Sequence, residues 1–188
     1  MQQEWHITVN DYEPVRWHQW CTDQGIKPLF IELNNFERQL MCAISLKQYN
    51  ALTQWDGGLN AKYGLVEAIE LAGFSVLRVK YEVQPRAIDV TTHGDKEKVW
   101  HRPPVDNALY YECHIKLEGQ FRPEFRMASR DLYRRHRWYV THRQDGPFTP
   151  EKFVEIVERR IASRNPIIEF EYEACLVDTN KGLDARWN

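Results

Sequence analysis

Residues 108–118, ALYYECHIKLE, alternate between apolar and polar side chains, and this pattern constrains the fold more than any other stretch. A period of two residues is typical of a β-strand, because successive side chains point to opposite faces of a sheet. One face is apolar and predicts a buried core, formed by Tyr111, Cys113, Ile115 and Leu117. The other face carries a row of polar side chains, namely Tyr110, Glu112, His114, Lys116 and Glu118.

Further elements follow from the same kind of pattern. Strands are expected at 4–9, 28–33, 40–47, 74–84, 138–143 and 167–177, and helices at 15–24, 61–72, 123–135 and 150–164. The element order nearly repeats, which predicts an α+β fold of two similar ferredoxin-like halves, with antiparallel sheets and helices packed on one face. The halves are expected at 1–84 and 108–188, with a linker or long loop at 85–107. Accidental similarity between two α+β halves is the alternative interpretation.

Composition excludes some classes of partner. The net charge of −2 gives no overall attraction to nucleic acid or to an anionic membrane, so a polyanion site has to be a local patch. The N-terminus lacks the pattern of a secretory signal, and no apolar run approaches the roughly 20 residues of a membrane span. The four cysteines form no C-x-x-C pair, and we expect free thiols, with Cys113 and Cys175 buried on apolar strand faces. These features predict a soluble, cytoplasmic protein with no membrane partner.

Charged residues alternate on several of the expected strands. The rows are Arg78-Lys80-Glu82, Glu112-His114-Lys116-Glu118 and Glu169-Glu171-Glu173, with Thr141 and Arg143 as a shorter one. On one open face, cations could hold phosphate and carboxylates could do acid–base work or hold Mg²⁺. The phosphate-binding candidates in these rows are Lys80, Lys116 and Arg143, and the acidic candidates are Glu82, Glu112, Glu169 and Glu171. The alternative is a solvated face with ordinary cross-strand ion pairs.

His114 lies one step from Lys116 and one step from Glu112 along the strand. A nearby carboxylate favours the charged imidazole and a nearby ammonium opposes it, so the two effects partly cancel. We therefore expect His114 to titrate near neutrality, as a general acid or base requires.

Two expected strands carry a histidine in a similar setting, His6-Ile7-Thr8 and His114-Ile115-Lys116. This pattern resembles that of the 2H phosphoesterases, in which two such histidines face each other across a pseudo-symmetric cleft. The resemblance implies that one histidine takes a proton from a ribose 2′-hydroxyl or water, that the other protonates the leaving group, and that Thr8 holds phosphate. Lys116 stands where the family has Ser or Thr, and His6 lies nearer the start of the chain than the family's first motif. The alternative is an ordinary surface or capping role for each histidine.

The same first strand also resembles the vicinal-oxygen-chelate module, in which a His on the first strand and a Glu on the last strand bind a divalent metal. That resemblance implies metal-ligand roles for His6, Glu82, His114 and Glu171. The module has one helix followed by three strands, whereas each half of this chain is expected to have two helices.

Arginines recur every four residues between 122 and 134, which predicts a basic helix face with Tyr133, Trp138 and Tyr139 nearby. Basic and aromatic side chains together can bind phosphate backbones and stack on bases, so Arg130 is a further phosphate-binding candidate. The alternative is a solvated face whose charges pair with acids elsewhere.

Together these patterns predict a protein that binds or processes a phosphate-bearing ligand, such as a nucleotide or an RNA end. If it is an enzyme, it is a 2H-phosphoesterase-like phosphodiesterase in which His6 and His114 transfer protons. The alternative is a non-catalytic binding or protein-interaction module that uses the same polar face. The motifs identify no cofactor, and we predict no metal site.

Overall fold

The computed structural model describes residues 3–10, 13–32, 38–45, 47–48, 61–85, 88–90, 99–101, 104–118, 132–135, 139–161 and 166–183. In chain order the elements are β1 (Gln3–Val9), α1 (Pro14–Asp23), β2 (Lys27–Glu32), β3 (Arg38–Ser45), α3 (Ala61–Leu71), β4 (Val76–Val83), β5 (Ile88–Val90), β6 (Val99–His101), β7 (Tyr110–Leu117), β8 (Leu132–Arg135), β9 (Tyr139–Gln144), α4 (Pro150–Ile161) and β10 (Ile167–Asp178). The fold is therefore α+β.

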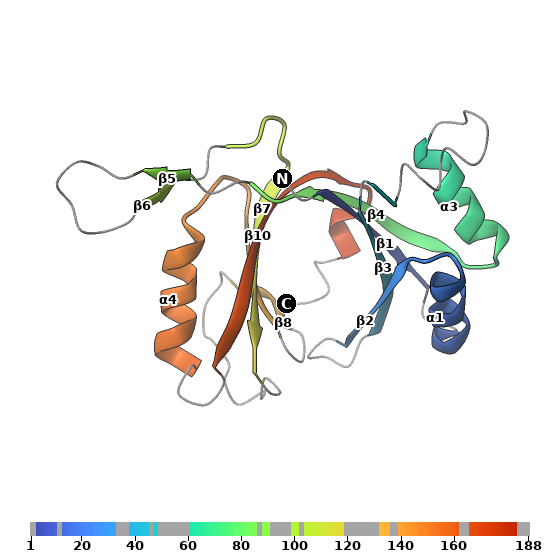
Figure 1. Ribbon diagram of the computed structural model, residues 1–188, viewed down its shortest axis with the longest axis horizontal. Coiled ribbons are helices and arrows are strands. Elements are labelled where there is room, and N and C mark those ends of the chain that lie inside the picture. Colours follow the sequence, from blue (N-terminus) through green and yellow to red (C-terminus); the bar gives the residue numbers. More distant parts are fainter. Residues whose placement is uncertain are drawn as a thin grey trace.

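Eight strands form one antiparallel sheet in the order β2-β3-β1-β4-β10-β7-β9-β8. The first four belong to the N-terminal half of the chain and the last four to the C-terminal half, and β4 pairs with β10 where the halves meet. Outward from that seam the order is β4, β1, β3, β2 on one side and β10, β7, β9, β8 on the other. The sheet bends, so that the strands beyond β4 and β10 run down either side (Figure 1).

Alternation along the strands gives the sheet two chemically different faces. On the helix face, Ile7, Val9, Leu40, Cys42 and Ile44 pack against apolar residues of α1 and α3. A second cluster on the same face joins β7 and β10 to α4 through Ile115, Tyr172 and Val157, among others. The helices lie outside the bend (Figure 1), and each half of the sheet has its own apolar core.

The helices of the first half end in the same way. Gly25 follows α1 with φ +66°, and Gly73 follows α3 with φ +87°. The amide of each glycine donates to a carbonyl three residues back, and the next amide donates five residues back, to Cys21 after α1 and to Ile69 after α3. This is the hydrogen-bond pattern of a Schellman motif, which favours glycine at the left-handed position.

Most elements expected from the pattern are present, but the expected helix at 123–135 is wrong at its C-terminal end. Residues 132–135 form the edge strand β8, which pairs with β9, and residues 119–131 lie outside the described part of the chain. The region 85–107, expected as a linker or long loop, contains the short strands β5 and β6, which pair antiparallel. The longest strand is β10 with 12 residues, followed by β3, β4 and β7 with eight residues each.

Among the residues that the structure describes, no helix has the length and apolar character required to cross a membrane.

Candidate polar site on the sheet

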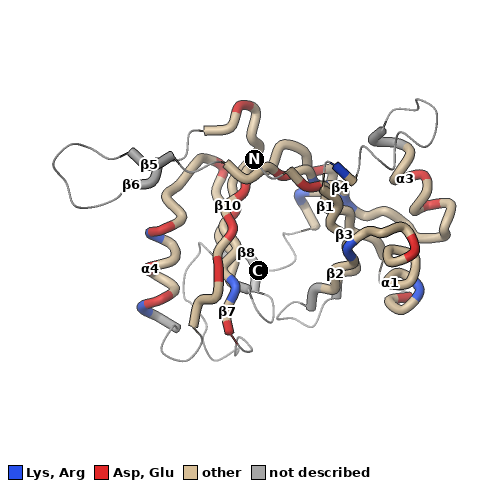
Figure 2. Tube along the Cα trace, viewed as in Figure 1, with Lys and Arg blue, Asp and Glu red and all other residues tan. Residues whose placement is uncertain are grey.

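The face opposite the helices, here called the polar face, carries the charged rows of both halves. Charged positions recur along its central strands, and those of β10 are acidic (Figure 2). Its side chains come from β1 (His6, Thr8), β4 (Arg78, Lys80, Glu82), β10 (Glu171, Glu173, Cys175, Asp178), β7 (Tyr110, Glu112, His114, Lys116) and β9 (Thr141, Arg143). The expected rows therefore do share one sheet face.

The centre of the polar face is buried, whereas an open, solvated face was expected. Arg78, Lys80, Glu82, Glu112, Thr141 and Glu173 are all buried. Each of these strands thus buries both of its faces around the seam. The expectation failed because charges from strands far apart in the sequence compensate one another there, which alternation within one strand does not reveal.

His6 is held between two carboxylates. Its Nδ1 lies 3.0 Å from Glu82 Oε2, and its Nε2 lies 3.4 Å from Glu4 Oε2. Burial opposes the charged imidazole, but hydrogen bonds to Glu4 and Glu82 outweigh it and raise the pKa of His6 to about 10. At neutral pH His6 is therefore a cation with both ring N–H groups directed at carboxylates.

His114 has a hydroxyl on one side and carboxylates on the other. Its Nδ1 lies 2.8 Å from Thr141 Oγ1, while its Nε2 lies 3.5 Å from Glu112 and 3.4 Å from Glu173. Burial again opposes the charge, but Glu112 and Glu173 outweigh it and raise the pKa of His114 to about 9. The expected titration near neutrality is thus wrong, because the carboxylates around this imidazole dominate.

Lys80 joins the two halves at the centre of the face. Its ammonium contacts both Glu82 and Glu112, although Lys80 and Glu112 are separated by strand β10. Cys175, which lies opposite Glu82 in the register between β10 and β4, is a small buried side chain close enough to Lys80 to feel its charge. Burial works against ionisation of Glu82, but Lys80 and His6 outweigh it and lower the pKa of Glu82 to about 2.

A second ion pair across the seam lies beside the first. Arg78 donates to Asp178 through Nε at 2.9 Å and Nη2 at 2.5 Å, and Nη2 also donates to the Tyr110 hydroxyl at 3.0 Å. The Tyr110 hydroxyl in turn donates to Asp178 at 2.5 Å. The guanidinium of Arg143 lies 3.5 Å from the centre of the Tyr110 ring. Four groups from four strands are therefore fixed relative to one another.

Cys175 lies on the polar face, and its expected place on an apolar strand face is wrong. Its thiol faces Tyr110 and lies near Lys80 and Glu82, while the neighbours Ala174 and Tyr172 enter the core. Burial is the main cause that raises the pKa of Cys175 to about 12. All four cysteines are free thiols, as expected, and Cys21 and Cys42 are buried along with Cys113 and Cys175.

Of the remaining candidate residues, those that the structure describes take no part in the ion pairs at the buried centre of the polar face. Lys116 pairs with Glu169 at 2.8 Å, and these side chains are 37% and 51% exposed. Glu171 is also exposed, whereas Thr8 is buried beside His6 and its hydroxyl has no hydrogen-bond partner within the described part of the chain. Arg130 lies outside the described residues.

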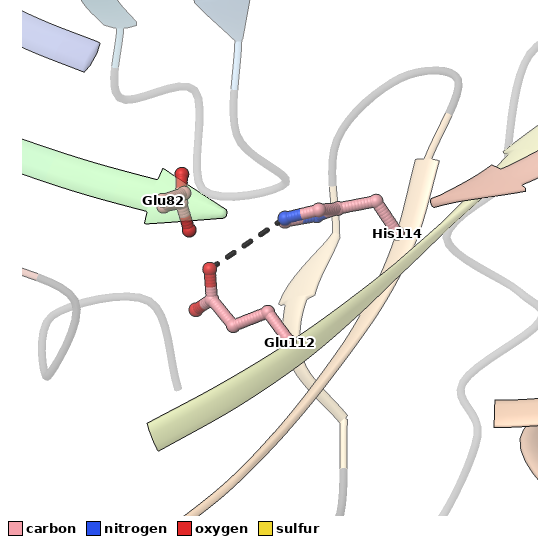
Figure 3. Close-up of side chains that lie close together, drawn as sticks. All are labelled: Glu82, Glu112 and His114. Atoms are coloured by element: carbon pink, nitrogen blue, oxygen red, sulfur yellow. Dashed lines mark ion pairs between the residues drawn. The ribbon is translucent and has the colours of Figure 1, made fainter. Parts of the chain in front are cut away.

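Glu82, Glu112 and His114 point toward one another (Figure 3), and one ligand atom of each lies within 4.8 Å of the others. Such spacing is compatible with a metal ion. However, the ammonium of Lys80 already contacts both carboxylates, so a divalent ion would have to displace a buried lysine. We therefore do not assign these residues as metal ligands.

Sequence reasoning missed two of the groups that fix the centre, Asp178 and Tyr110. Strict alternation from Glu173 and Cys175 points to residue 177, but the register shifts between Cys175 and Val177 and places Asp178 opposite Lys80. A bulge of this kind leaves no clear mark in the sequence. For Tyr110, the available signal was its place at the head of the polar row of 108–118.

Comparison of the chain with protein-family models, with curated proteins and with solved structures gives no match.

Proposed function

We propose that this protein binds a phosphate-bearing ligand, such as a nucleotide or an RNA end, on the polar face of its sheet. The observation that carries the proposal is the convergence of two imidazolium groups on one cluster of carboxylates. His6 contacts Glu82, and Glu82 lies within 4.8 Å of the ligand atoms of Glu112 and His114. Imidazolium, ammonium and guanidinium groups at one place form the charge-assisted hydrogen bonds that phosphate oxygens require.

The proposal includes a duplicated, ferredoxin-like origin for the two halves. Outward from the seam, the N-terminal half has the order β4, β1, β3, β2 and the C-terminal half has the order β10, β7, β9, β8. Each half therefore places its last strand at the seam, followed by its first, third and second strands, and a helix precedes the last strand in each half. His6 on β1 and His114 on β7 then occupy corresponding strands on opposite sides of the seam. A pseudo-twofold arrangement would account for two histidines far apart in the sequence each pairing with a carboxylate of its neighbouring strand, His6 with Glu82 on β4 and His114 with Glu173 on β10.

Turnover as a 2H-phosphoesterase-like phosphodiesterase is the catalytic form of the proposal. It needs one neutral imidazole as base and one protonated imidazole as acid. The pKa values of both imidazoles are raised, to about 9 for His114 and about 10 for His6, so a neutral imidazole beside a charged one becomes well populated only at alkaline pH. We expect any phosphodiesterase activity to rise from pH 7 to a maximum near these values.

A non-catalytic binding module is the second candidate, and the same pKa values favour it at neutral pH. Both imidazoles are then charged, so both donate hydrogen bonds and neither accepts a proton. The two candidates share the ligand-binding site and differ only in turnover at alkaline pH.

A thermal-shift screen tests the proposal. Nucleotides, cyclic nucleotides, inorganic phosphate and divalent metals are added to the wild-type protein, to a His6→Gln/His114→Gln variant and to a His18→Gln control on the exposed side of α1. A ligand that prefers the folded state raises Tm by mass action. We expect phosphate compounds to raise Tm in the wild type and control but not in the double variant. Equal shifts in all three proteins, or none in any, contradict the proposal.

A further inference from the structure

Three cations from three strands converge on the carboxylate of Glu112. Lys80 Nζ on β4 contacts it, His114 Nε2 on β7 lies 3.5 Å from Oε2, and Arg143 Nε on β9 lies 4.0 Å from Oε1. Glu112 is fully buried, and Arg143 lies directly opposite it in the β7–β9 register. An ammonium, an imidazolium and a guanidinium around one anionic group are the same set that holds a phosphate group in proteins.

We propose that Glu112 is an internal anion that occupies an oxyanion subsite formed by Lys80, His114 and Arg143, and that a phosphate group enters this subsite by displacing it. The inference rests on the proposed function and adds to it the cations that hold the phosphate and a built-in competitor for the site. The chain thereby holds the subsite in a closed state in the absence of ligand.

Other groups around Glu112 repel its carboxylate, so the carboxylate is bound less strongly than its three cations alone would bind it. The facing groups are Lys80 and Glu82 on β4, Tyr110 and His114 on β7, Arg143 on β9, and Glu173 and Cys175 on β10. Two of these are carboxylates, and Glu173 lies directly opposite Glu112 in the β7–β10 register. Like charges this close repel one another, so these two carboxylates weaken the hold of the three cations on Glu112.

The carboxylates that remain after displacement keep cations of their own. Glu82 retains His6 at 3.0 Å and the contact with Lys80, and Glu173 retains His114 at 3.4 Å. The ligand thus replaces one anion by another among the same cations. No metal or co-reactant is needed for this exchange.

Displacement of the Glu112 carboxylate changes the number of protons that the protein binds. A buried carboxylate that loses its cations is costly as an anion, so it binds a proton from solvent. For each phosphate group that enters, one proton is therefore taken up by Glu112, and affinity for phosphate falls as pH rises. A phosphate that simply adds to an open cationic surface would require no such uptake.

Isothermal titration calorimetry with inorganic phosphate tests the inference on the full chain. Wild type, Glu112→Gln and Glu155→Gln are titrated at pH 8, where inorganic phosphate is already mostly the dianion and has little proton of its own to release. Two buffers with different ionisation enthalpies are used, because the difference between buffers counts the protons exchanged. We expect wild type to take up a proton and Glu112→Gln to bind at least about tenfold more tightly without uptake, since the competitor is gone. Glu155→Gln removes the same charge from an exposed position on α4, away from the polar face, and we expect a change of less than about twofold.

The outcomes separate this inference from the proposed function. If wild type binds phosphate without proton uptake, or if folded Glu112→Gln binds no more tightly, Glu112 is not a displaceable anion and the inference fails, whereas the proposed function stands. If Glu112→Gln does not fold, proton uptake by wild type decides alone. If neither protein binds inorganic phosphate or the phosphate compounds of the thermal-shift screen, both the inference and the proposed function fail.

Discussion

Lys80 and Lys116 are the same residue type on the same sheet face, but their surroundings differ. Lys80 is 2% exposed and compensates two buried carboxylates, whereas the Lys116 side chain is 37% exposed and contacts one exposed carboxylate. Removing one partner of a buried ion pair leaves an uncompensated charge, while an exposed pair is screened by water. Burial therefore decides how much each lysine contributes to the free energy of unfolding.

We expect Lys80→Ala to lower the free energy of unfolding by about 3–5 kcal/mol. Lys116→Ala should lower it by no more than about 1 kcal/mol and should weaken the binding of a phosphate ligand. Urea denaturation at pH 7 measures the first effect, and calorimetry with the ligand measures the second. A loss of several kcal/mol in Lys116→Ala would show that the buried ionic network extends to the edge of the polar face.

The two histidines predict a loss of stability at alkaline pH. A pKa raised in the folded state means that proton binding favours folding, fully below the unfolded value near 6.5 and decreasingly as pH rises to about 9 for His114 and about 10 for His6. We expect the free energy of unfolding to fall between pH 7 and 10. His6→Gln/His114→Gln should flatten this part of the curve, and His18→Gln should leave it unchanged. A wild-type curve that is flat or rising over this range contradicts the assignment of charged imidazoles.

At the scale of elements, the ends of α1 and α3 provide a matched pair of glycines. A Cβ at Gly25 meets no atom within 4 Å, whereas one at Gly73 approaches the Arg16 guanidinium to 2.8 Å, and that guanidinium contacts the Ala72 carbonyl. We expect Gly25→Ala to cost about 1 kcal/mol from its left-handed backbone, and Gly73→Ala to cost more because Arg16 must also move. In an Arg16→Ala background the two costs should become equal in urea denaturation. A difference that persists there would contradict this explanation.

Alternation and helical periodicity were sufficient to predict most elements, because those patterns reflect which face of an element is buried. The ranges 74–84, 108–118 and 167–177 contain β4, β7 and nearly all of β10, and 150–164 contains α4. The edge strand β8 was not predictable in this way, because arginines at helical spacing also fit a short strand that pairs with β9. The register shift after Cys175 was equally hidden, and with it the role of Asp178.

At the scale of the whole molecule, the pairing of β4 with β10 joins the two apolar cores through one continuous sheet. The two apolar clusters are distinct, although the one under β7 and β10 extends across the seam to Val83 of β4, and on the polar face Lys80–Glu112 and Arg78–Asp178 cross the same seam. The candidate site could be predicted only as rows of charge on separate strands. Its burial and its pairing depend on which strands meet in the sheet, and no single stretch of sequence contains that information.

A substitution at Asp178 tests how much the ion pairs across the seam contribute to stability. Asp178→Asn leaves Arg78 buried without its carboxylate, so we expect a loss of about 3–5 kcal/mol at pH 7 in urea denaturation. Arg78 and Tyr110 outweigh burial and lower the pKa of Asp178, so its contribution is present above the unfolded value near 3.8 and is lost as pH falls below it. The variant should therefore lose less stability than wild type on acidification. Asp145→Asn, at an exposed turn, serves as the control. It should change neither the free energy of unfolding at pH 7 nor the loss of stability on acidification.

The most direct test of a phosphate site between the two histidines is nuclear magnetic resonance of ¹⁵N-labelled imidazoles during a titration with inorganic phosphate at pH 8. Both His6 and His114 should shift along one saturation curve with the Kd that calorimetry gives, because both imidazolium groups face the same carboxylate cluster. His18 on α1 and His142, which packs against Phe148 and Phe153 on the helix face, should not shift. Saturable shifts at His18 or His142, with His6 and His114 unmoved, would contradict the account.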